Sequence, residues 1–427
     1  MRILIVGASG LIGSAIAARL SAEGHDVAGV GRNSNRNFQK MRWISFDVSV
    51  ATREEIWRPL LQDIDTVINC AGTLQDSPSE STEGVHVKGI SALYGACVKA
   101  GVTRVIHFSA LGADRKATRF SQSKLRGEQE LRSRDLNWVI LRPSVVIGRS
   151  AYGGSALIRG LAALPVLPVM PETAELQPVH LDDVVETVVK LLKPESPQRQ
   201  IFELAGPRRY QFHELVQTFR QWMRWSPARL LGLPSWAASA FYRLGDAAAV
   251  LGWKPPIRST AQREMRFGAI ADPSAREQGT CIKARQLEAT LLGEPASVQE
   301  RWFARMYLLK PLIFAVFGAF WITTGLISLG PGWDIGTGYV REGGQSQAVA
   351  AAATIAGALA DIIIGLAILY RPTARYGLYA ALLISLAYAI IGTLLVPRLW
   401  IDPLGPMLKI WPIIAFNLVA LAIVDDR

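Results

Sequence analysis

Cysteine and histidine are scarce in this chain of 427 residues, which contains three cysteines and five histidines. Cys70, Cys97 and Cys281 are far apart, odd in number and without the spacing of a metal-binding motif. These features exclude a small disulfide-stabilised scaffold, and we expect no metal site. They favour a reducing compartment in which the thiols are free and buried.

Charged residues are scarce in only one part of the chain. Residues 306–427 contain 7 Lys and Arg and 6 Asp and Glu, whereas residues 1–305 contain 39 and 29. This division is typical of a soluble domain followed by a membrane domain. It excludes a wholly cytosolic enzyme and a disordered chain.

The net charge of +11 is also uneven, because residues 206–305 alone carry +7. This basic excess directly precedes the hydrophobic third, where basic groups favour anionic lipid headgroups. The sequence has no basic arm, no aromatic platform motif and no Cys/His finger. We therefore expect membrane lipid, and no nucleic acid, among its partners.

The first residues predict a nucleotide-binding strand and helix rather than a signal peptide. Arg2 to Val6 form a short apolar run that stops at glycine, and apolar residues then recur at helical spacing. The glycines allow a tight turn, close approach of a pyrophosphate and close packing of the helix, whose free N–H groups favour phosphate. The residues predicted to bind cofactor here are Gly7, Ser9, Gly10, Leu11, Ile12 and Gly13.

A second predicted strand, from His25 to Val30, is followed by Gly31 and Arg32. An acidic residue at this point would favour NAD, whereas Arg32, with Arg36 beyond it, suits the 2′-phosphate of NADP. The sequence therefore favours NADP(H) over NAD(H). The alternative is an ordinary solvated arginine.

Further strands are predicted at intervals along the same region. Residues 43–48 end in Asp47, which could accept from the adenine amino group, and Val48, which could pack on the ring. Thr66 to Ile68 lead into a turn whose small residues Ala71 and Gly72 leave room for the cofactor. With strands at 104–108 and 138–141, the alternation predicts a doubly wound parallel sheet.

Seven segments in order resemble the short-chain dehydrogenase/reductase (SDR) superfamily: GASGLIG, NCAG, VIHFSALGA, FSQSK, ILRPSVVIG, QPVHLDDVV and FELAGP. The resemblance is greatest to its extended and atypical branch, which includes sugar-nucleotide epimerase-like proteins and the nucleotide-binding accessory subunit of respiratory complex I. It covers residues 1–220. It implies an α/β Rossmann-type fold with a small substrate-side subdomain.

The resemblance also implies a catalytic Ser, a Tyr and a Lys four residues after the Tyr. Ser109 and Lys124 match, but Phe120 stands in the tyrosine position, and a phenyl ring has no proton to exchange. Three interpretations stay open. The domain binds nucleotide silently, with Lys124 on the nicotinamide ribose; or it is a reductase whose proton comes from Ser109, substrate or water; or the site is vestigial.

Two further groups lie near the predicted site. Pro143 shapes its nicotinamide end, with Ser144 to Val146 lining it, unless this is an ordinary exit from a strand. His180, Asp182 and Asp183 could suggest a catalytic pair or metal site, but we expect Asp182 to cap a helix over 184–192. His86 stands where the extended branch usually has Asn, and we assign it no chemistry.

Residues 221–305 predict a basic, Trp-rich helical linker next to the membrane. Residues 229–252 predict one or two short helices that either lie in the membrane interface or close the substrate-side subdomain. In the first case, the aromatic residues at headgroup depth are Trp236, Phe241 and Tyr242.

Residues 306–427 predict an all-α bundle of four spans, because each apolar stretch approaches or exceeds the about 20 residues that cross a bilayer. The predicted spans are 308–329, 348–370, 376–396 and 408–424. Lys and Arg predominate before the first span and between the second and third. This bias predicts a multi-pass inner-membrane protein with its nucleotide domain in the cytoplasm.

The stretches FWITTGLISL and GALADIIIGLAIL resemble the DoxX-like family of small four-span proteins. Asp361, in the second predicted span, is costly there unless paired or neutral. It predicts a quinone-head or proton site, or only a hydrogen bond to another helix, towards Asn417 or Tyr388.

Together these features predict a membrane-anchored NAD(P)(H)-binding protein of the SDR type. It is linked either to redox chemistry on quinone or another lipid-soluble acceptor or redox partner, or to nucleotide-dependent sensing and assembly. The alternative is an active reductase or epimerase, acting on a small or nucleotide-sugar-like substrate, that uses Ser109 and Lys124 without the tyrosine. The sequence does not indicate an oligomeric state.

Overall fold

The computed structural model describes residues 1–32, 41–78 and 80–425. It divides into two compact units, one of residues 1–247 and 255–304 and one of residues 248–254 and 305–427. The predicted linker over 221–305 thus contributes mainly to the first unit and, through residues 248–254, to the second.

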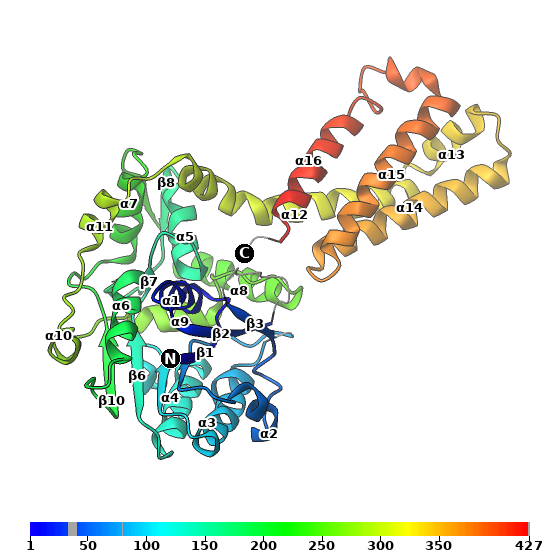
Figure 1. Cartoon of the computed structure of the whole chain (residues 1–427). Helices are drawn as coiled ribbons and strands as arrows, with labels where there is room; N and C mark the ends of the chain where they lie inside the picture. The colour runs from blue at the N-terminus through cyan, green and yellow to red at the C-terminus, as the bar shows by residue number, and fades with distance from the viewer. Residues whose placement is uncertain (33–40, 79, 426–427) are drawn as a thin grey trace. The chain divides into compact units, whose positions relative to one another are not determined.

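The first unit contains the predicted doubly wound parallel sheet, which is confirmed (Figure 1). All paired strands of this seven-stranded sheet are parallel, and their order is β10-β6-β5-β4-β1-β2-β3. The strands are β1 (Arg2–Val6), β2 (Asp26–Gly31), β3 (Arg42–Ser45), β4 (Thr66–Asn69), β5 (Arg104–Phe108), β6 (Trp138–Pro143) and β10 (Gln200–Leu204). The third ends three residues earlier than predicted, so Asp47 lies in the loop after it.

Helices cover both faces of this sheet because successive strand residues point to opposite sides. Ile3 and Ile5 pack with one group of helices, whereas Leu4 and Val6 pack with the other. The first group is α1 (Leu11–Ala22) and α6 (Leu181–Leu191). The second is α2 (Glu54–Trp57), α3 (Gly89–Ala100) and α4 (Arg119–Arg132). Short turns include a π-helix at Gly84–Lys88 and 3₁₀ turns at Arg58–Leu60 and Ala113–Arg115.

The rest of the first unit consists of short strand pairs and helices. The strands are β7 (Val146–Ile147) paired with β9 (Val179–His180), and β8 (Val166–Val169) paired with β11 (Arg229–Gly232). The helices are α5 (Gly153–Ala162), α7 (Phe212–Trp222), α8 (Ser235–Val250), α9 (Ser259–Phe267), α10 (Ser274–Thr280) and α11 (Leu287–Gly293). The prediction of helix from residue 229 is therefore wrong for β11, which pairs with a segment about sixty residues earlier.

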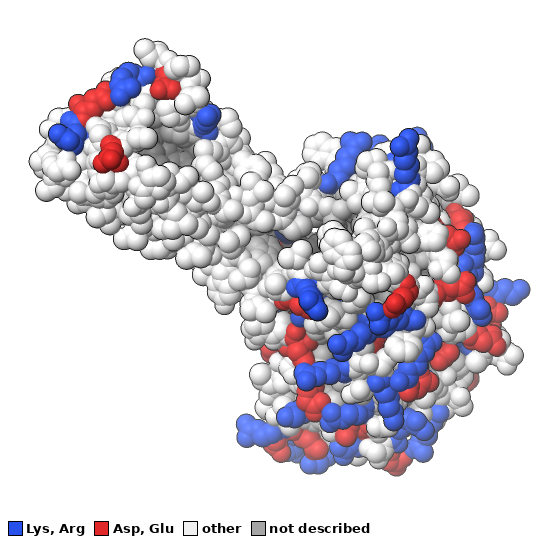
Figure 2. Space-filling view, turned by 180° about the vertical axis from the view of Figure 1, so that it is seen from behind, with Lys and Arg blue, Asp and Glu red and all other residues white. Residues whose placement is uncertain are grey.

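The second unit is helical. Its elements are α12 (Val298–Leu329), whose first residues lie in the first unit, α13 (Trp333–Glu342), α14 (Gln347–Leu369), α15 (Ala374–Leu395), a 3₁₀ turn (Pro397–Trp400) and α16 (Ile410–Ile423). Three described helices, α12, α14 and α15, are long and apolar enough to cross a membrane. On the face shown in Figure 2, this unit carries charged side chains mainly at one end.

The fourth predicted span differs in length from expectation. Only α16 is helical there, and its 14 residues extend about 21 Å, less than the about 30 Å of a hydrocarbon core. Pro403 and Pro406 lack backbone N–H groups, and Gly405 between them has a φ of 59°. The chain therefore turns before Lys409 and the helix begins late.

The cysteines follow the sequence expectation only in part. Cys97 is buried and Cys70 is half-buried, but Cys281 is exposed. Cys281 ends α10 in a left-handed conformation with a φ of 56°, and the prediction of a buried thiol is wrong there. All three thiols are free.

Candidate functional site

The glycine-rich turn after β1 is built so that side chains would not fit. Gly7 has a φ of 81°, and a Cβ on it would lie 2.7 Å from the backbone nitrogen of Ala71. A Cβ on Gly13 would lie 2.4 Å from the carbonyl oxygen of Gly7. Gly10 begins α1 and provides no side-chain cap, so the first-turn N–H groups suit an anion.

This turn lies at the carboxyl ends of β1 and β4, where the strand order of the sheet reverses. Ligands of doubly wound sheets bind at this switch point. The Asn69 carboxamide oxygen accepts from the backbone N–H of Ala71 (3.1 Å), and its amide contacts Tyr94 and His107. This buried network fixes the predicted residues Ala71 and Gly72 beside the turn.

The predicted adenosine-end residues lie in loops after β2 and β3. Arg32 forms an ion pair with Glu80 (2.8 Å), whereas Arg36 lies outside the described residues. The Asp47 carboxylate accepts from the backbone N–H and hydroxyl of Ser49 (2.9 and 2.8 Å). Val48 is buried beside it.

Lys124 lies on α4 and points into the switch-point region. Its ammonium donates to the carbonyl oxygens of Phe108 (2.9 Å) and Ala71 (3.4 Å), and a Cβ on Gly72 would lie 3.1 Å from it. Burial lowers the pKa of Lys124 to about 8, an effect partly opposed by Cys70 and Glu128. At neutral pH the side chain of Lys124 is therefore still mainly a cation, and it lies at the carboxyl end of β5.

Ser109 and Phe120 complete the triad-like positions. Ser109 follows β5 and is buried, and its hydroxyl has no hydrogen-bond partner among the described residues. Phe120 is half-buried one turn before Lys124, with its ring centroid 5.7 Å from that of His86. The structure thus brings the predicted Ser and Lys together with a phenyl ring where the family has a phenol.

His86 is a site neighbour to which the sequence analysis assigned no chemistry. Its Nε2 accepts from the backbone N–H of Thr73 (3.0 Å), and its Nδ1 lies 2.8 Å from the Ser123 hydroxyl. Burial, reinforced by Lys124, holds the pKa of His86 well below its usual range. The imidazole is therefore neutral with both nitrogens engaged. It lies on a π-helical turn, an irregularity that is frequent at functional sites and that the sequence analysis did not predict.

Pro143 is the last residue of β6, and Ser144 follows it at the same carboxyl edge of the sheet. The Pro143 carbonyl accepts from the backbone N–H of Leu111 (3.1 Å). The Ser144 hydroxyl donates to the carbonyl oxygen of Ala269 (3.0 Å), so a segment distant in the sequence lies against this end of the site. No pattern in the sequence indicates that contact.

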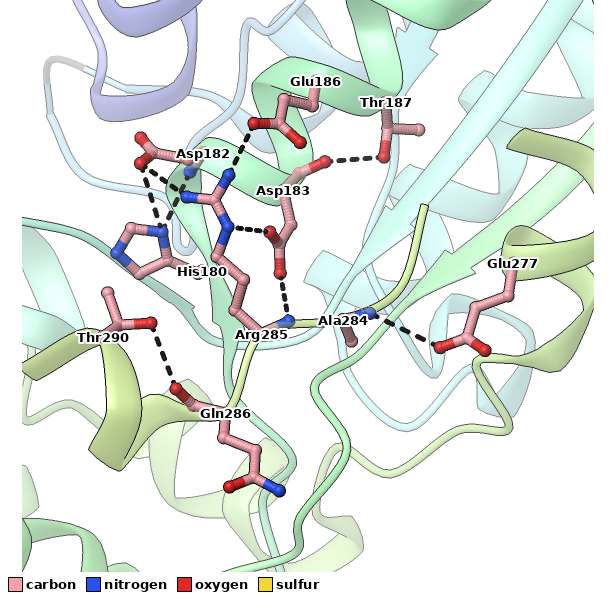
Figure 3. Close-up of polar contacts among 10 residues, drawn as sticks. All are labelled: His180, Asp182, Asp183, Glu186, Thr187, Glu277, Ala284, Arg285, Gln286 and Thr290. Carbon is pink, nitrogen blue, oxygen red and sulfur yellow. Dashed lines mark hydrogen bonds and ion pairs between the residues drawn. The ribbon is translucent and has the colours of Figure 1, made fainter. Parts of the chain in front are cut away.

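The cluster around His180 is an anchor for an arginine rather than a helix cap by Asp182 (Figure 3). The α6 cap is His180, whose Nδ1 accepts from the backbone N–H of Asp182 (3.3 Å), and the capping prediction is wrong. Arg285 binds three carboxylates of α6, those of Asp182 (2.9 Å), Asp183 (3.1 Å) and Glu186 (2.5 Å). Burial raises the pKa of Asp183 although Arg285 opposes this effect.

Asp182 and Asp183 thus bind Arg285, and these ion pairs hold the segment that contains Arg285 against α6. Over residues 1–32, 41–78 and 80–425, no group of three or more His, Cys, Asp or Glu side chains could hold a metal ion. The arginine lies about one hundred residues beyond its partners, which no local pattern could reveal.

Comparisons with known proteins fit this architecture. Residues 3–205 match the NAD dependent epimerase/dehydratase family, and residues 318–418 match the DoxX-like family. The chain spans about a quarter of the length of the first curated relatives it matches.

Two relatives match over more of their own length. The NADH-ubiquinone oxidoreductase 40 kDa subunit of Neurospora crassa is 29% identical over 64% of this chain and 72% of that protein. A ceramide reductase of Caulobacter vibrioides is 25% identical over 60% of this chain and 80% of that protein.

A solved structure, MoeE5 in complex with UDP-glucose and NAD, aligns with a TM-score of 0.54. It covers 72% of this chain and 100% of MoeE5 at 19% identity, which supports the fold alone. From these matches and the observed sheet, the chain joins an NAD-dependent epimerase/dehydratase domain of the SDR type to a DoxX-like domain.

Proposed function

We propose that this protein is anchored in the cytoplasmic membrane and binds NAD(P)(H) in its N-terminal domain, on the cytoplasmic side, as a sensing or assembly module. The observation that carries this proposal is a glycine turn and lysine that suit a dinucleotide, beside a phenyl ring where the reaction's acid or base would stand. The three apolar helices support the anchor. A reporter fused before Met1 would test the orientation of the nucleotide domain directly, and its activity on the outer side would contradict it.

The residues have separate roles in this proposal. Gly7, Gly10 and Gly13 admit the pyrophosphate at the α1 N-terminus, with Ser9, Leu11 and Ile12 around it. Asp47 and Val48 meet the adenine, and Ala71, Gly72 and Pro143 border the nicotinamide half. Lys124 binds the nicotinamide ribose, for which its lowered pKa still leaves a cation at neutral pH.

Proton transfer has few candidates around Phe120. The neutral His86 uses Nε2 to accept from a backbone N–H, and its Nδ1 faces Ser123. Neither imidazole nitrogen is therefore available to replace the phenol. This arrangement supports binding without ordinary carbonyl or alcohol chemistry.

Arg32 is proposed to favour NADP(H) over NAD(H). In the structure Glu80 neutralises it, so binding of a 2′-phosphate requires the guanidinium to be shared or exchanged. We expect Arg32→Ala to weaken NADPH binding by roughly tenfold and to leave NADH binding unchanged. Equal loss for both nucleotides would contradict the assignment.

The central test is tryptophan-to-nicotinamide fluorescence transfer on the full chain, titrated with NADPH and NADH. Binding without turnover is the expected result, and no binding of either nucleotide would make the site vestigial. Phe120→Tyr, which restores the family's phenol, should then create activity that the wild type lacks. Oxidation of NADPH by the wild type would contradict silent binding.

A second candidate function is reduction of a lipid-soluble acceptor such as a quinone. The specific support is the buried Ser109 hydroxyl, which has no hydrogen-bond partner within the described part of the chain, together with similarity to a respiratory-complex subunit and a ceramide reductase. When bound, the nicotinamide supplies the hydride. Quinone-dependent NADPH oxidation that Ser109→Ala abolishes, with binding intact, would favour this function over sensing.

A further inference from the structure

One apolar surface of the first unit is left uncovered. It is made by β11 and the outer face of α8, and we call it the α8 surface. Its exposed apolar members are Leu230, Leu231, Trp236, Phe241 and Leu244. Trp236 is 76% exposed and Leu244 is 65% exposed.

The opposite face of α8 already packs against the protein. Ala238, Tyr242, Gly245 and Ala249 are buried there, as expected for residues three to four positions apart on one helical stripe. The outer face is therefore not needed for the core of its own unit. Exposed large apolar side chains gathered on one helical face in this way are typical of an interaction surface.

The chain connects the α8 surface directly to the helical unit. α8 continues to Val250, and residues 248–254 belong to the helical unit. Leu251 accepts from the backbone N–H of Arg371 (2.9 Å), and the Trp253 indole donates to Leu369 (2.8 Å), both at the end of α14. Leu244 precedes residue 248 by four positions, which is about 6 Å along a helix.

The second connection between the units, at the start of α12, also carries an exposed aromatic residue next to arginine. α12 begins in the first unit, and its Trp302, 68% exposed, lies three residues before Arg305, where the helical unit begins. Arg301 precedes it directly. Tryptophan flanked by arginine is typical of the boundary between hydrocarbon and headgroups.

Charge decides between neutral and anionic lipid. Arg229 and Arg243 are exposed members of β11 and α8, in the segment of the chain that holds most of its net positive charge. Apolar side chains flanked by arginines suit an interfacial helix on acidic phospholipid. No comparable acidic residue is exposed on α8, since Asp246 is bound by Arg258 and Gln75.

We infer that the α8 surface lies in the headgroup layer of an anionic phospholipid membrane. Trp236, Phe241 and Leu244 enter the interface, and Arg229 and Arg243 bind lipid phosphates. On the inner side of the same helix, Asp246 accepts from Gln75 (3.0 Å) in the loop that follows β4. Lipid contact thereby fixes the rim of the candidate nucleotide site without requiring that nucleotide be bound.

Spin-label accessibility on the full chain tests this inference. Single labels are placed at Leu244→Cys and Trp236→Cys in a Cys281→Ser background, since Cys281 is the exposed thiol. Two reference labels are used: Val50→Cys, an exposed apolar position of the Rossmann sheet region, and Ile363→Cys on the outer face of α14. The protein is held in nanodiscs of phosphatidylcholine with or without phosphatidylglycerol.

We expect labels at 244 and 236 to show a ratio of oxygen to nickel-chelate accessibility roughly fivefold above that of position 50. The ratio should stay below that of position 363 and fall when phosphatidylglycerol is omitted or Arg243→Gln is added. Ratios equal to position 50 would overturn the inference, and ratios independent of phosphatidylglycerol would overturn its anionic part. An aqueous ratio at 363 would instead overturn the membrane anchor itself.

Discussion

The two units of this protein place apolar and polar side chains in opposite ways. In the Rossmann-type unit, strand residues such as Leu4 and Ile5 are fully buried and charged groups cover the outside (Figure 2). In the helical unit, large side chains such as Ile363 and Leu383 face outwards, whereas Asp361, Ser385 and Asn417 are buried. The second unit is thus organised for an apolar solvent, because in lipid large apolar side chains can face outwards whereas polar groups need partners in the interior.

The same contrast applies to buried ionisable groups. Lys124 is held by two backbone carbonyls at a sheet edge where ligands bind. Asp361 is held by the Tyr388 hydroxyl (3.0 Å) on the adjacent helix, whereas the Asn417 amide donates to Leu378 (2.9 Å). The predicted partner Tyr388 is therefore found and Asn417 is not. One buried group suits ligand binding, and the other joins two helices.

A charged residue at an outward position of each unit should produce the largest difference between the two units. Leu383→Asp should cost about 3 kcal/mol of insertion free energy, because the carboxylate would face hydrocarbon. Val50→Asp, at an equally exposed position of the first unit, should cost less than about 0.5 kcal/mol. Resistance to alkaline extraction from membranes measures both. Equal behaviour of the two variants would mean that water surrounds both units.

Lys124 predicts a stability change with pH that belongs to the first unit. Its folded-state pKa is about 8 against an ordinary value of 10.5, so between these values the unfolded chain binds a proton that the folded chain does not. The free energy of unfolding should therefore rise from about pH 8 to about pH 10.5, by up to roughly 3 kcal/mol. Below about pH 8 this contribution should be constant.

The measurement is denaturant unfolding of the nucleotide-free protein at several pH values, with Lys124→Met as the reference. The difference between wild type and variant should shift in favour of the wild type as the pH rises. A difference that is independent of pH would show that Lys124 titrates normally.

Both units contain glycines at close backbone contacts, so the same substitution can be compared in each unit. A Cβ on Gly13 would lie 2.4 Å from the Gly7 carbonyl oxygen, and one on Gly325 would lie 2.4 Å from that of Ala358. Gly13→Ala and Gly325→Ala should each cost about 2 kcal/mol of unfolding free energy through overpacking. Only the first should also lower nucleotide affinity. Gly154→Ala, which meets no atom within 4 Å, is the matched control and should change neither.

The smallest expected effect concerns Asp361. Asp361→Ala removes the partner of Tyr388 and should cost about 1 kcal/mol, whereas Asp361→Asn keeps a hydrogen bond and should cost less. Thermal unfolding in detergent measures both stabilities. The control is Tyr379→Phe, at an exposed position of α15, the helix that carries Tyr388. Full stability of Asp361→Ala together with lost quinone-dependent activity would assign a functional rather than a joining role.

Much of the fold could be predicted because it depends on local patterns. The strand from Arg2 to Val6 and the helix after the glycine turn follow from apolar periodicity and glycine spacing, and the structure has β1 and α1 there. The glycine-turn part of the candidate site was predictable for the same reason, whereas Ser109, after β5, and Lys124, within α4, were assigned from the family resemblance. The family resemblance identified Phe120 as the departure.

Contacts between distant segments could not be predicted in this way. Three contacts join residues more than sixty positions apart: the pairing of β11 with β8, the ion pairs of Arg285 with α6, and the hydrogen bond of Ser144 to Ala269. The neutral state of His86 also depends on burial beneath Thr73 and beside Lys124. Neither the burial of a single polar residue nor a partner far away in the sequence leaves a periodic pattern.

The sequence by itself determined the first six strands of the parallel sheet, the nucleotide-type turn and the division into a charged and an apolar region, because each is set by neighbouring residues or by composition. Only the tertiary structure decided that His180 rather than Asp182 caps α6, that α16 is short, and that α8 leaves an apolar face uncovered. These outcomes depend on which surfaces meet, and the free energy of such contacts belongs to pairs of segments rather than to either segment alone.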